Sequence, residues 1–202
     1  MKIDKIMPGT IATIVLLLTT GFLYGQGDPP NGLKKGDLAP TFNGINQYGD
    51  SISLAELVNK GKVILFFYRG HWCPYCNKHL SQLQDSLQLI LDKGASVIAI
   101  TPENSEYIEK TTSKTGATFN ILYDQGHQIM DAYKVSFQEK KSKAKSYKIF
   151  LGGDLEKAHG DSDYILPVPA TYIIGSDGKI SYVHFDTDYK KRATVTEIIN
   201  QL

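Results

Sequence analysis

Two continuous apolar runs, at residues 62–68 and 96–101, dominate the hydrophobic pattern of the chain. Neither run alternates with polar residues, so each predicts a central strand of a sheet that is covered on both faces. Between the two runs, apolar residues recur at intervals of three and four, which predicts one helix ending at Gly94. These residues are Leu80, Leu83, Leu87, Ile90 and Leu91.

Shorter patterns and turn residues predict the remaining elements. Residues 33–54 should form an amino-terminal hairpin, and the S-x-x-E spacing of Ser53 and Glu56 predicts a capping box that opens a helix at residues 54–58. The later pattern predicts a polar helix ending near Lys114, a strand at 119–123, a helix at 125–133, strands at 171–174 and 180–185 joined by a turn at 176–179, and a helix at 194–202. Residues 138–166 show no clear period and are expected to form an irregular excursion.

This order of elements predicts one α/β domain over residues 33–202, with parallel strands first and an antiparallel hairpin later. The formal net charge of +1 gives no indication of a nucleic-acid surface or of an acidic partner. The one local charge bias is a lysine cluster, which at this density is typical of a solvated loop or helix face. Its members are Lys140, Lys141, Lys143, Lys145 and Lys148.

The first 25 residues have the plan of a secretory signal peptide. Lys2 and Lys5 precede an apolar run at residues 11–24, and small residues follow at the expected cleavage point near Gly25. The run is shorter than the ~20 residues that a membrane-spanning helix needs, which favours cleavage over an uncleaved anchor. We therefore expect a mature chain without stable membrane insertion, exported to a compartment such as the periplasm, where disulfides persist.

Cys73 and Cys76 are the only two cysteines, and they form a C-x-x-C motif where an apolar strand turns into a helix. A disulfide between them would close a very small ring and stabilise the fold little, so the pair indicates dithiol redox chemistry. Free N–H groups at the start of a helix stabilise a thiolate, and Pro74 suits the first helical position. One of the two thiols should therefore be ionised at neutral pH.

Two histidines flank the cysteines as H-x-C-x-x-C-x-x-H, which offers four potential zinc ligands in nine residues. Structural zinc sites more often join two separated ligand pairs, and no second pair follows. We therefore expect neither a metal nor another cofactor. His79 is expected to be a surface or packing residue, and His71 an exposed residue of the turn.

Several ordered motifs resemble the thioredoxin fold and, more closely, its peroxiredoxin-like branch, the alkyl hydroperoxide reductase and thiol-specific antioxidant family. They are Gly36-Asp37-x-Ala39-Pro40-x-Phe42, Phe67-Tyr68-Arg69-Gly70, Trp72-Cys73-x-x-Cys76, Thr101-Pro102-Glu103 and Val168-Pro169-Ala170-Thr171. The resemblance spans residues 33–202. It implies a central mixed β-sheet flanked by helices, with an added amino-terminal hairpin.

The resemblance implies a peroxidase that reduces hydroperoxides through the dithiol and is recycled by a thioredoxin-like protein. The alternative is an exported thiol–disulfide oxidoreductase that acts on protein disulfides. The two analogies differ on the attacking sulfur. Peroxiredoxin logic favours Cys76 for peroxide, and thioredoxin logic favours Cys73 for disulfide exchange.

Three residues near the dithiol are expected to contribute to substrate binding: Trp72, Arg69 and Pro169. In the thioredoxin fold the proline before the corresponding strand is cis and faces the dithiol, and the resemblance gives Pro169 that role. Peroxiredoxins have an arginine at this position. Arg69 could substitute for it or could be an ordinary surface charge; the only other arginine of the chain is Arg192.

Overall fold

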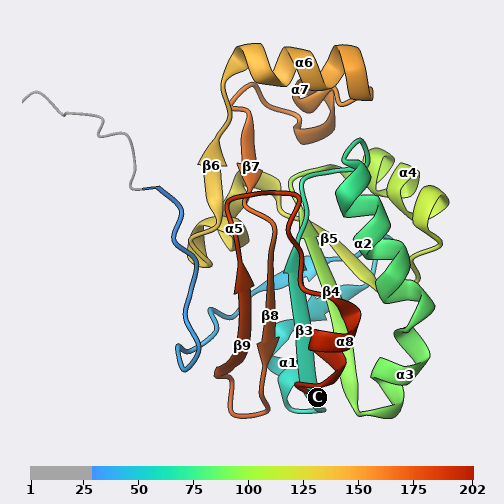
Figure 1. Cartoon of the computed structure of the whole chain (residues 1–202), viewed down its shortest axis with the longest axis vertical. Helices are drawn as coiled ribbons and strands as arrows, with labels where there is room; N and C mark the ends of the chain where they lie inside the picture. The colour runs from blue at the N-terminus through green and yellow to red at the C-terminus, as the bar shows by residue number, and fades with distance from the viewer. Residues whose placement is uncertain (1–28) are drawn as a thin grey trace, which may run out of the picture.

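A computed structural model describes residues 29–202 of the chain, so the predicted signal peptide lies outside the described residues. A mixed sheet of five strands forms the centre, in the order β5-β4-β3-β8-β9 (Figure 1). Strands β3, β4 and β5 are parallel, β8 pairs antiparallel with β3, and β9 pairs antiparallel with β8. Their bounds are β3 Lys62–Phe67, β4 Ala95–Thr101, β5 Asn120–Tyr123, β8 Ala170–Ile174 and β9 Ile180–Phe185. The predicted fold class is confirmed.

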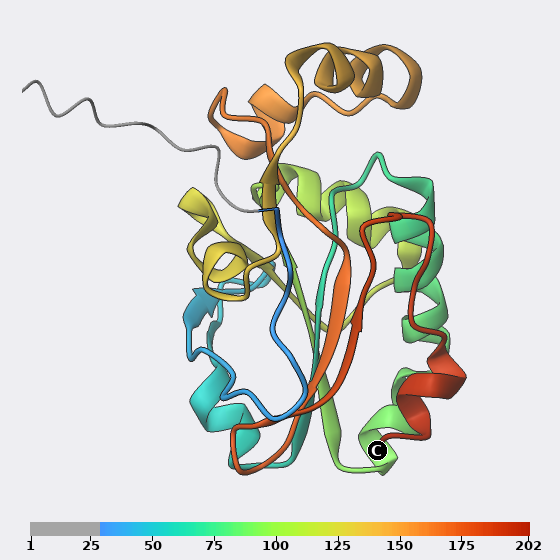
Figure 2. The same cartoon turned by 60° about the vertical axis from the view of Figure 1, so that its left-hand side comes forward.

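Side chains of β3 pack on both faces of the sheet, as its continuous apolar run predicts. Ile64 and Phe66 belong to one core, and Val63, Leu65 and Phe67 belong to the other. Helices therefore cover both faces (Figure 2). The first core includes residues of α2 (Pro74–Asp85), α3 (Leu87–Asp92), α4 (Ser105–Thr115) and α8 (Val195–Ile199), and the second includes residues of α1 (Leu54–Val58) and α5 (Gln128–Ala132).

The helix after the cysteines is divided, although the sequence predicts one continuous helix. Ser86, at φ −106° and ψ 6°, separates α2 from α3, and its N–H bonds the carbonyl of Leu83. The break leaves Ile90 fully buried while Leu91 is 47% exposed. The periodicity predicted one apolar face over both helices, whereas in α3 only Ile90 is fully buried and Leu87 is partly buried against the same core.

The amino-terminal hairpin is confirmed, but the predicted capping box is wrong. Strands β1 (Asn43–Ile45) and β2 (Ser51–Ser53) pair antiparallel, and α1 follows at once. The Ser53 side chain makes no capping bond, and the N–H of Leu54 donates to the carbonyl of Phe42 at 3.1 Å. A reciprocal capping box exists instead at Thr194 and Glu197, at the start of α8.

Residues 139–164, here called the excursion, contain two helices where the sequence predicted irregular structure. Helices α6 (Lys141–Leu151) and α7 (Leu155–His159) lie between the paired strands β6 (Ser136–Gln138) and β7 (Ile165–Pro167). Only Ala144 and Tyr147 of α6 are buried, which is too few apolar positions to make a helical period visible.

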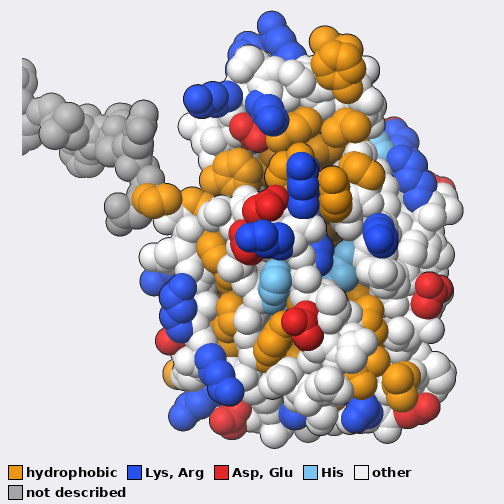
Figure 3. All heavy atoms as spheres, viewed as in Figure 1, with side chains coloured by type: hydrophobic (Ala, Val, Ile, Leu, Met, Phe, Trp, Pro, Cys, Tyr) orange, Lys and Arg blue, Asp and Glu red, His pale blue; other side chains and the backbone are white. Residues whose placement is uncertain are grey.

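The excursion stands beyond the end of the sheet, at the top of Figure 1. All five lysines of the cluster at residues 140–148 are exposed, as the sequence predicts, and basic side chains surround this projection in Figure 3. Within residues 29–202, no helix has the length and apolar character that crossing a membrane requires.

Candidate active site

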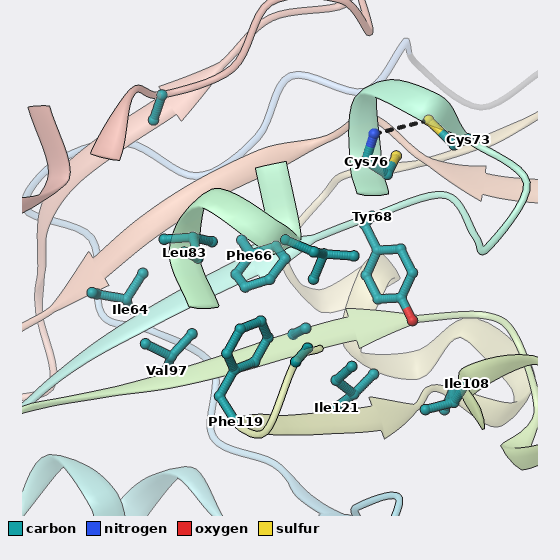
Figure 4. Packing of buried hydrophobic residues seen from close by; sticks show 14 of the residues in the cluster. Ile64, Phe66, Tyr68, Cys73, Cys76, Leu83, Val97, Ile108, Phe119 and Ile121 are labelled. Carbon is teal, nitrogen blue, oxygen red and sulfur yellow. Dashed lines mark hydrogen bonds between the residues drawn. The ribbon is translucent and has the colours of Figure 1, made fainter. Parts of the chain in front are cut away.

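The two cysteines lie together at the start of α2, as their spacing predicts. Cys73 is the N-cap residue, Pro74 begins the helix, and the backbone N–H of Cys76 donates to Sγ of Cys73 at 3.4 Å (Figure 4). Both residues are buried, at 0% and 1% exposure. The thiols are therefore close enough to form a disulfide within one helical turn, and neither is open to solvent.

Each sulfur has an arginine beside it. Nη2 of Arg69 lies 3.8 Å from Sγ of Cys73, and Nη2 of Arg192 lies 3.5 Å from Sγ of Cys76. Arg69 is 3% exposed, so of the two interpretations that the sequence left open, the surface charge is wrong. Sequence reasoning missed Arg192, which reaches the site from the segment between β9 and α8; the scarcity of arginine in this chain was the available signal.

The surroundings favour ionisation of Cys76 over Cys73. Burial opposes ionisation of Cys76, but the hydrogen bond from Cys73 and the positive charge of Arg192 outweigh it, and the pKa of Cys76 falls to about 5. The pKa of Cys73 is raised, because its thiol hydrogen-bonds to Cys76 and because it is buried. At neutral pH the pair therefore carries one thiolate, on Cys76, with Cys73 as its hydrogen-bond donor.

Aromatic rings enclose the guanidinium of Arg69. It lies 4.9 Å from the ring centroid of Trp72 and 4.1 Å from that of Tyr189, and Nη1 donates to the hydroxyl of Tyr147 at 3.3 Å. Cation–π contacts of this kind hold a buried guanidinium without a carboxylate partner. The positive charge of Arg69 is thus kept available to the sulfur of Cys73.

The excursion covers the site through Trp72. The ring of Tyr147 stacks on Trp72 with centroids 4.4 Å apart, and Gly153 lies so close that a Cβ there would be 2.5 Å from Cγ of Trp72. Trp72 is consequently only 3% exposed. A protein substrate cannot contact either sulfur in this arrangement unless the excursion moves.

His71 is not the exposed turn residue that the sequence predicts. It is 6% exposed, and its Nδ1 lies 2.8 Å from Oε1 of Glu103, whose Oε2 accepts the backbone N–H of His71 at 2.7 Å. Gly70 permits this approach, since it adopts φ +152° and a Cβ there would lie 2.4 Å from Oε1 of Glu103. Burial raises the pKa of Glu103. The pair joins the loop before α2 to the loop after β4, and so holds the cysteine turn in place.

His79 is a packing residue, one of the two roles that the sequence allowed. It is 5% exposed, and its ring centroid lies 5.7 Å from that of Phe66. Burial lowers the pKa of His79 to about 4, so the ring is neutral at neutral pH.

Pro169 is not in the cis form that the thioredoxin resemblance implies. No peptide bond in residues 29–202 is cis. The chain runs extended from β7, which ends at Pro167, into β8, which begins at Ala170, and the N–H of Val168 donates to the carbonyl of Val135 at 2.7 Å. The trans form suits this continuous path, because no tight turn occurs here that would require a cis bond.

A cleft of about 450 Å³ opens beside the guanidinium of Arg69 and the aromatic rings around it. Arg69, Pro169, Tyr147 and Tyr189 are among the residues that line it. Two of the three predicted substrate-binding residues, Arg69 and Pro169, therefore lie together in one cleft. Trp72 lies behind Tyr147 and does not line it.

Comparison with known proteins places this geometry in a family. The AhpC/TSA family model matches residues 35–183, which include both cysteines, Arg69 and Pro169. The chain belongs to the AhpC/TSA family. The motif-based resemblance is thereby confirmed over most of its predicted range.

Individual relatives of this AhpC/TSA chain carry two kinds of name. Peroxiredoxin Bcp of Escherichia coli K12 is 27% identical over 172 residues, covering 85% of this chain and 97% of its own. The thiol-disulfide oxidoreductase ResA of Bacillus thuringiensis is 23% identical over 183 residues, covering 89% of this chain and 87% of its own. The crystal structure of peroxidoxin BcpB from Mycobacterium tuberculosis has the same fold, with a TM-score of 0.64 at 19% identity, covering 84% of this chain and 96% of that one.

In this AhpC/TSA chain, Pro169 stands at the end of the segment that leads into β8, where the resemblance places an arginine. A guanidinium nevertheless reaches Cys76, because Arg192 approaches it from the segment after β9. A guanidinium is thus present at the sulfur of Cys76 although proline occupies position 169.

Proposed function

We propose that this protein is a thiol-dependent peroxidase in which Cys76 attacks the hydroperoxide and Cys73 resolves the product. The proposal rests mainly on the contact of Arg192 with Sγ of Cys76, at 3.5 Å. The second thiol lies in the same helical turn. A positive charge there stabilises the thiolate and can also orient the peroxide oxygens.

The proposed reaction uses the two thiols, the hydroperoxide and a dithiol reductant. The Cys76 thiolate attacks one peroxide oxygen, the O–O bond breaks, and the leaving oxygen takes up a proton to become water or an alcohol. Cys76 is then a sulfenic acid. The sulfur of Cys73 attacks it, the hydroxyl leaves as water with the Cys73 proton, and a disulfide joins the two residues. Two electrons from a thioredoxin-like dithiol protein restore both thiols.

The alternative function, exchange with protein disulfides, fits this geometry less well. In such exchange the attacking sulfur must meet a sulfur of another protein directly. Cys73 is 0% exposed and its pKa is raised, so it is neither accessible nor ionised here. A hydroperoxide is far smaller than a protein disulfide, so it needs a much smaller opening to reach the sulfur of Cys76. The likeness to ResA keeps the alternative worth testing beside the peroxidase.

The discriminating experiment compares rates for the two substrate classes. Reduced protein is mixed rapidly with hydrogen peroxide and, separately, with a protein disulfide, and the second-order rates are measured. We expect the peroxide reaction to be faster. Cys76→Ser should abolish it, whereas Cys73→Ser should keep the first step and accumulate sulfenic acid. Fast disulfide exchange beside a slow peroxide reaction would support the alternative function.

We also propose that residues 1–25 direct export, which makes the mature enzyme periplasmic. The support is the order of basic residues, apolar run and small residues in the sequence. Fractionation of a Gram-negative host that expresses the full chain, followed by amino-terminal sequencing, tests it. We expect periplasmic protein that begins shortly after Gly25, and an intact amino terminus in the cytoplasmic fraction would contradict the proposal.

A further inference from the structure

A second cluster of functional side chains lies outside the cysteine site, where the excursion meets the body of the fold. His127 follows β5, His159 ends α7, and Asp161 lies in the turn after α7. Ligand atoms of these three side chains all lie within 4.8 Å of one another. The two histidines come from segments 32 positions apart in the sequence, so only the fold brings them together.

His159 has buried polar atoms that lack partners. It is 3% exposed, and neither of its ring nitrogens has a hydrogen-bond partner among the described residues. Buried polar groups without partners are costly, and a bound ion at this point would give one of the two ring nitrogens a partner.

The spacing of the ligand atoms suits a small divalent ion. Nε2 of His127 lies 3.7 Å from Oδ2 of Asp161. This is too long for a hydrogen bond, but it is near the separation of about 3.3 Å expected for two ligands of one tetrahedral zinc ion. Two imidazoles and one carboxylate are ligands that zinc accepts, and they leave one position for water.

An ion can reach the cluster from solvent. A surface hollow beside it is lined by Glu106, Glu156, Gly160 and Asp161 among others, and its acidic side chains outnumber its one lysine. His127 itself adopts φ +62°, a conformation that is unusual for a residue other than glycine. The ring centroid of His127 lies 6.2 Å from that of His159, so the two side chains are neighbours at this junction.

We propose that His127, His159 and Asp161 bind a zinc-type divalent ion that fastens the excursion to the body of the fold. Existing hydrogen bonds already attach this part of α7: Asn104 N–H donates to the carbonyl of Ala158 at 2.8 Å, and the hydroxyl of Tyr123 donates to that of His159 at 2.7 Å. The ion adds a stronger connection there. It is separate from the dithiol and independent of the proposed peroxidase chemistry.

The test measures zinc binding by the full chain, after chelator treatment, with calorimetry and metal analysis. The Cys73→Ser, Cys76→Ser double variant excludes binding by the thiols, and it should still bind one zinc ion per chain at micromolar zinc. Cobalt should bind the same variant. In the wild-type protein, cobalt bound at this site should give no thiolate-to-metal charge-transfer band in the absorption spectrum. Zinc should also protect the excursion from proteolysis.

Matched variants then assign the ligands. In the double-serine background, His159→Gln should weaken zinc binding by at least about 100-fold, since even mutations beyond the direct ligands cost 10–100-fold. His127→Asn, which tolerates positive φ, should do the same, and circular dichroism checks that both fold. Asp161→Asn should weaken binding, and Asp163→Asn, the same change two residues along, should not. The proposal is overturned if the double-serine variant binds no zinc, or if His159→Gln and Asp163→Asn bind it equally well.

Discussion

At the scale of single residues, the chemistry of the site depends on which of the two sulfurs is better stabilised as a thiolate. Arg192 contacts Cys76 directly, and Cys76 also accepts the hydrogen bond of the neighbouring thiol. These two interactions overcome burial, which acting alone would raise the pKa of a buried cysteine. The same residue pair thus contains one reactive anion and one protonated thiol held ready to resolve it.

Replacing Arg192 should shift the pH dependence of the peroxide reaction. Loss of an opposite charge at this distance should raise the pKa of Cys76 from about 5 to roughly 6–8, because the thiolate loses its nearest cation. In Arg192→Gln the rate near pH 6 should therefore fall by about tenfold for each unit of pKa above that pH, while the rates near pH 9 converge. The measurement is the second-order rate with hydrogen peroxide across this range.

Two neighbouring substitutions serve as controls for that profile. Arg192→Lys keeps a positive charge and should shift the midpoint less. Lys191→Gln removes an exposed charge whose partner is Asp186, and it should leave the midpoint unchanged. An Arg192→Gln profile that coincides with the wild type would show that Arg192 does not stabilise the thiolate.

At the scale of elements, helix starts decide where the functional side chains are placed. Cys73 caps α2 with its sulfur, whereas Thr194 caps α8 two residues after Arg192. Oγ1 of Thr194 accepts the N–H of Glu197 at 3.1 Å, and Oε2 of Glu197 accepts the N–H of Thr194 at 2.7 Å. The second cap therefore anchors the segment that carries Arg192 to the sulfur of Cys76.

The S/T-x-x-E sites at the starts of α1 and α8 should differ in their contribution to stability. Thr194→Ala removes a reciprocal cap and should lower the free energy of unfolding by about 1 kcal/mol. Ser53→Ala removes a side chain that makes no capping bond and should change it by less than about 0.5 kcal/mol. Urea unfolding of the two variants measures both values. Equal losses, or a larger loss at Ser53, would contradict the assignment of the caps.

At the scale of the whole molecule, the excursion determines which partners reach the dithiol. Its Tyr147 stacks on Trp72 and accepts a hydrogen bond from Arg69, and both cysteines lie buried nearby. Reduction by a thioredoxin-like protein requires the excursion to move, because the reductant's sulfur must contact a sulfur of this dithiol directly. Opening of the excursion should therefore limit recycling of the oxidised enzyme.

Removing the aromatic cover should speed recycling by a protein reductant. Tyr147→Ala loses the stacking that holds the excursion on Trp72, so we expect oxidised Tyr147→Ala to be reduced several-fold faster by thioredoxin. Reduction by dithiothreitol, a small molecule, should change less. Tyr147→Phe keeps the ring and should behave like the wild type toward thioredoxin. If Tyr147→Ala shows no gain with thioredoxin, the excursion is not the barrier.

Local patterns predicted most of the sheet and the cysteine turn. Continuous apolar runs identified β3 and β4, and the C-x-x-C spacing placed both sulfurs at the start of α2. These features depend on neighbouring residues and on burial. Both are visible in the order of polar and apolar residues along the chain. The same local reasoning failed at Ser53, which makes no capping bond, and at Ser86, where the predicted helix is divided.

By itself, then, the sequence determined the strands of the central sheet and the identity of the reactive pair, because each is encoded within a few consecutive residues. The order of several short motifs along the chain indicated the family. Only the tertiary structure decided that Arg192 reaches Cys76, that the excursion covers Trp72 and that His71 pairs with Glu103. Each of these contacts joins residues at least 32 positions apart, and their approach depends on how the whole chain packs. Neither periodicity nor residue spacing in the sequence indicates such long-range contacts. The charged groups that control the chemistry can therefore be identified only in the folded molecule.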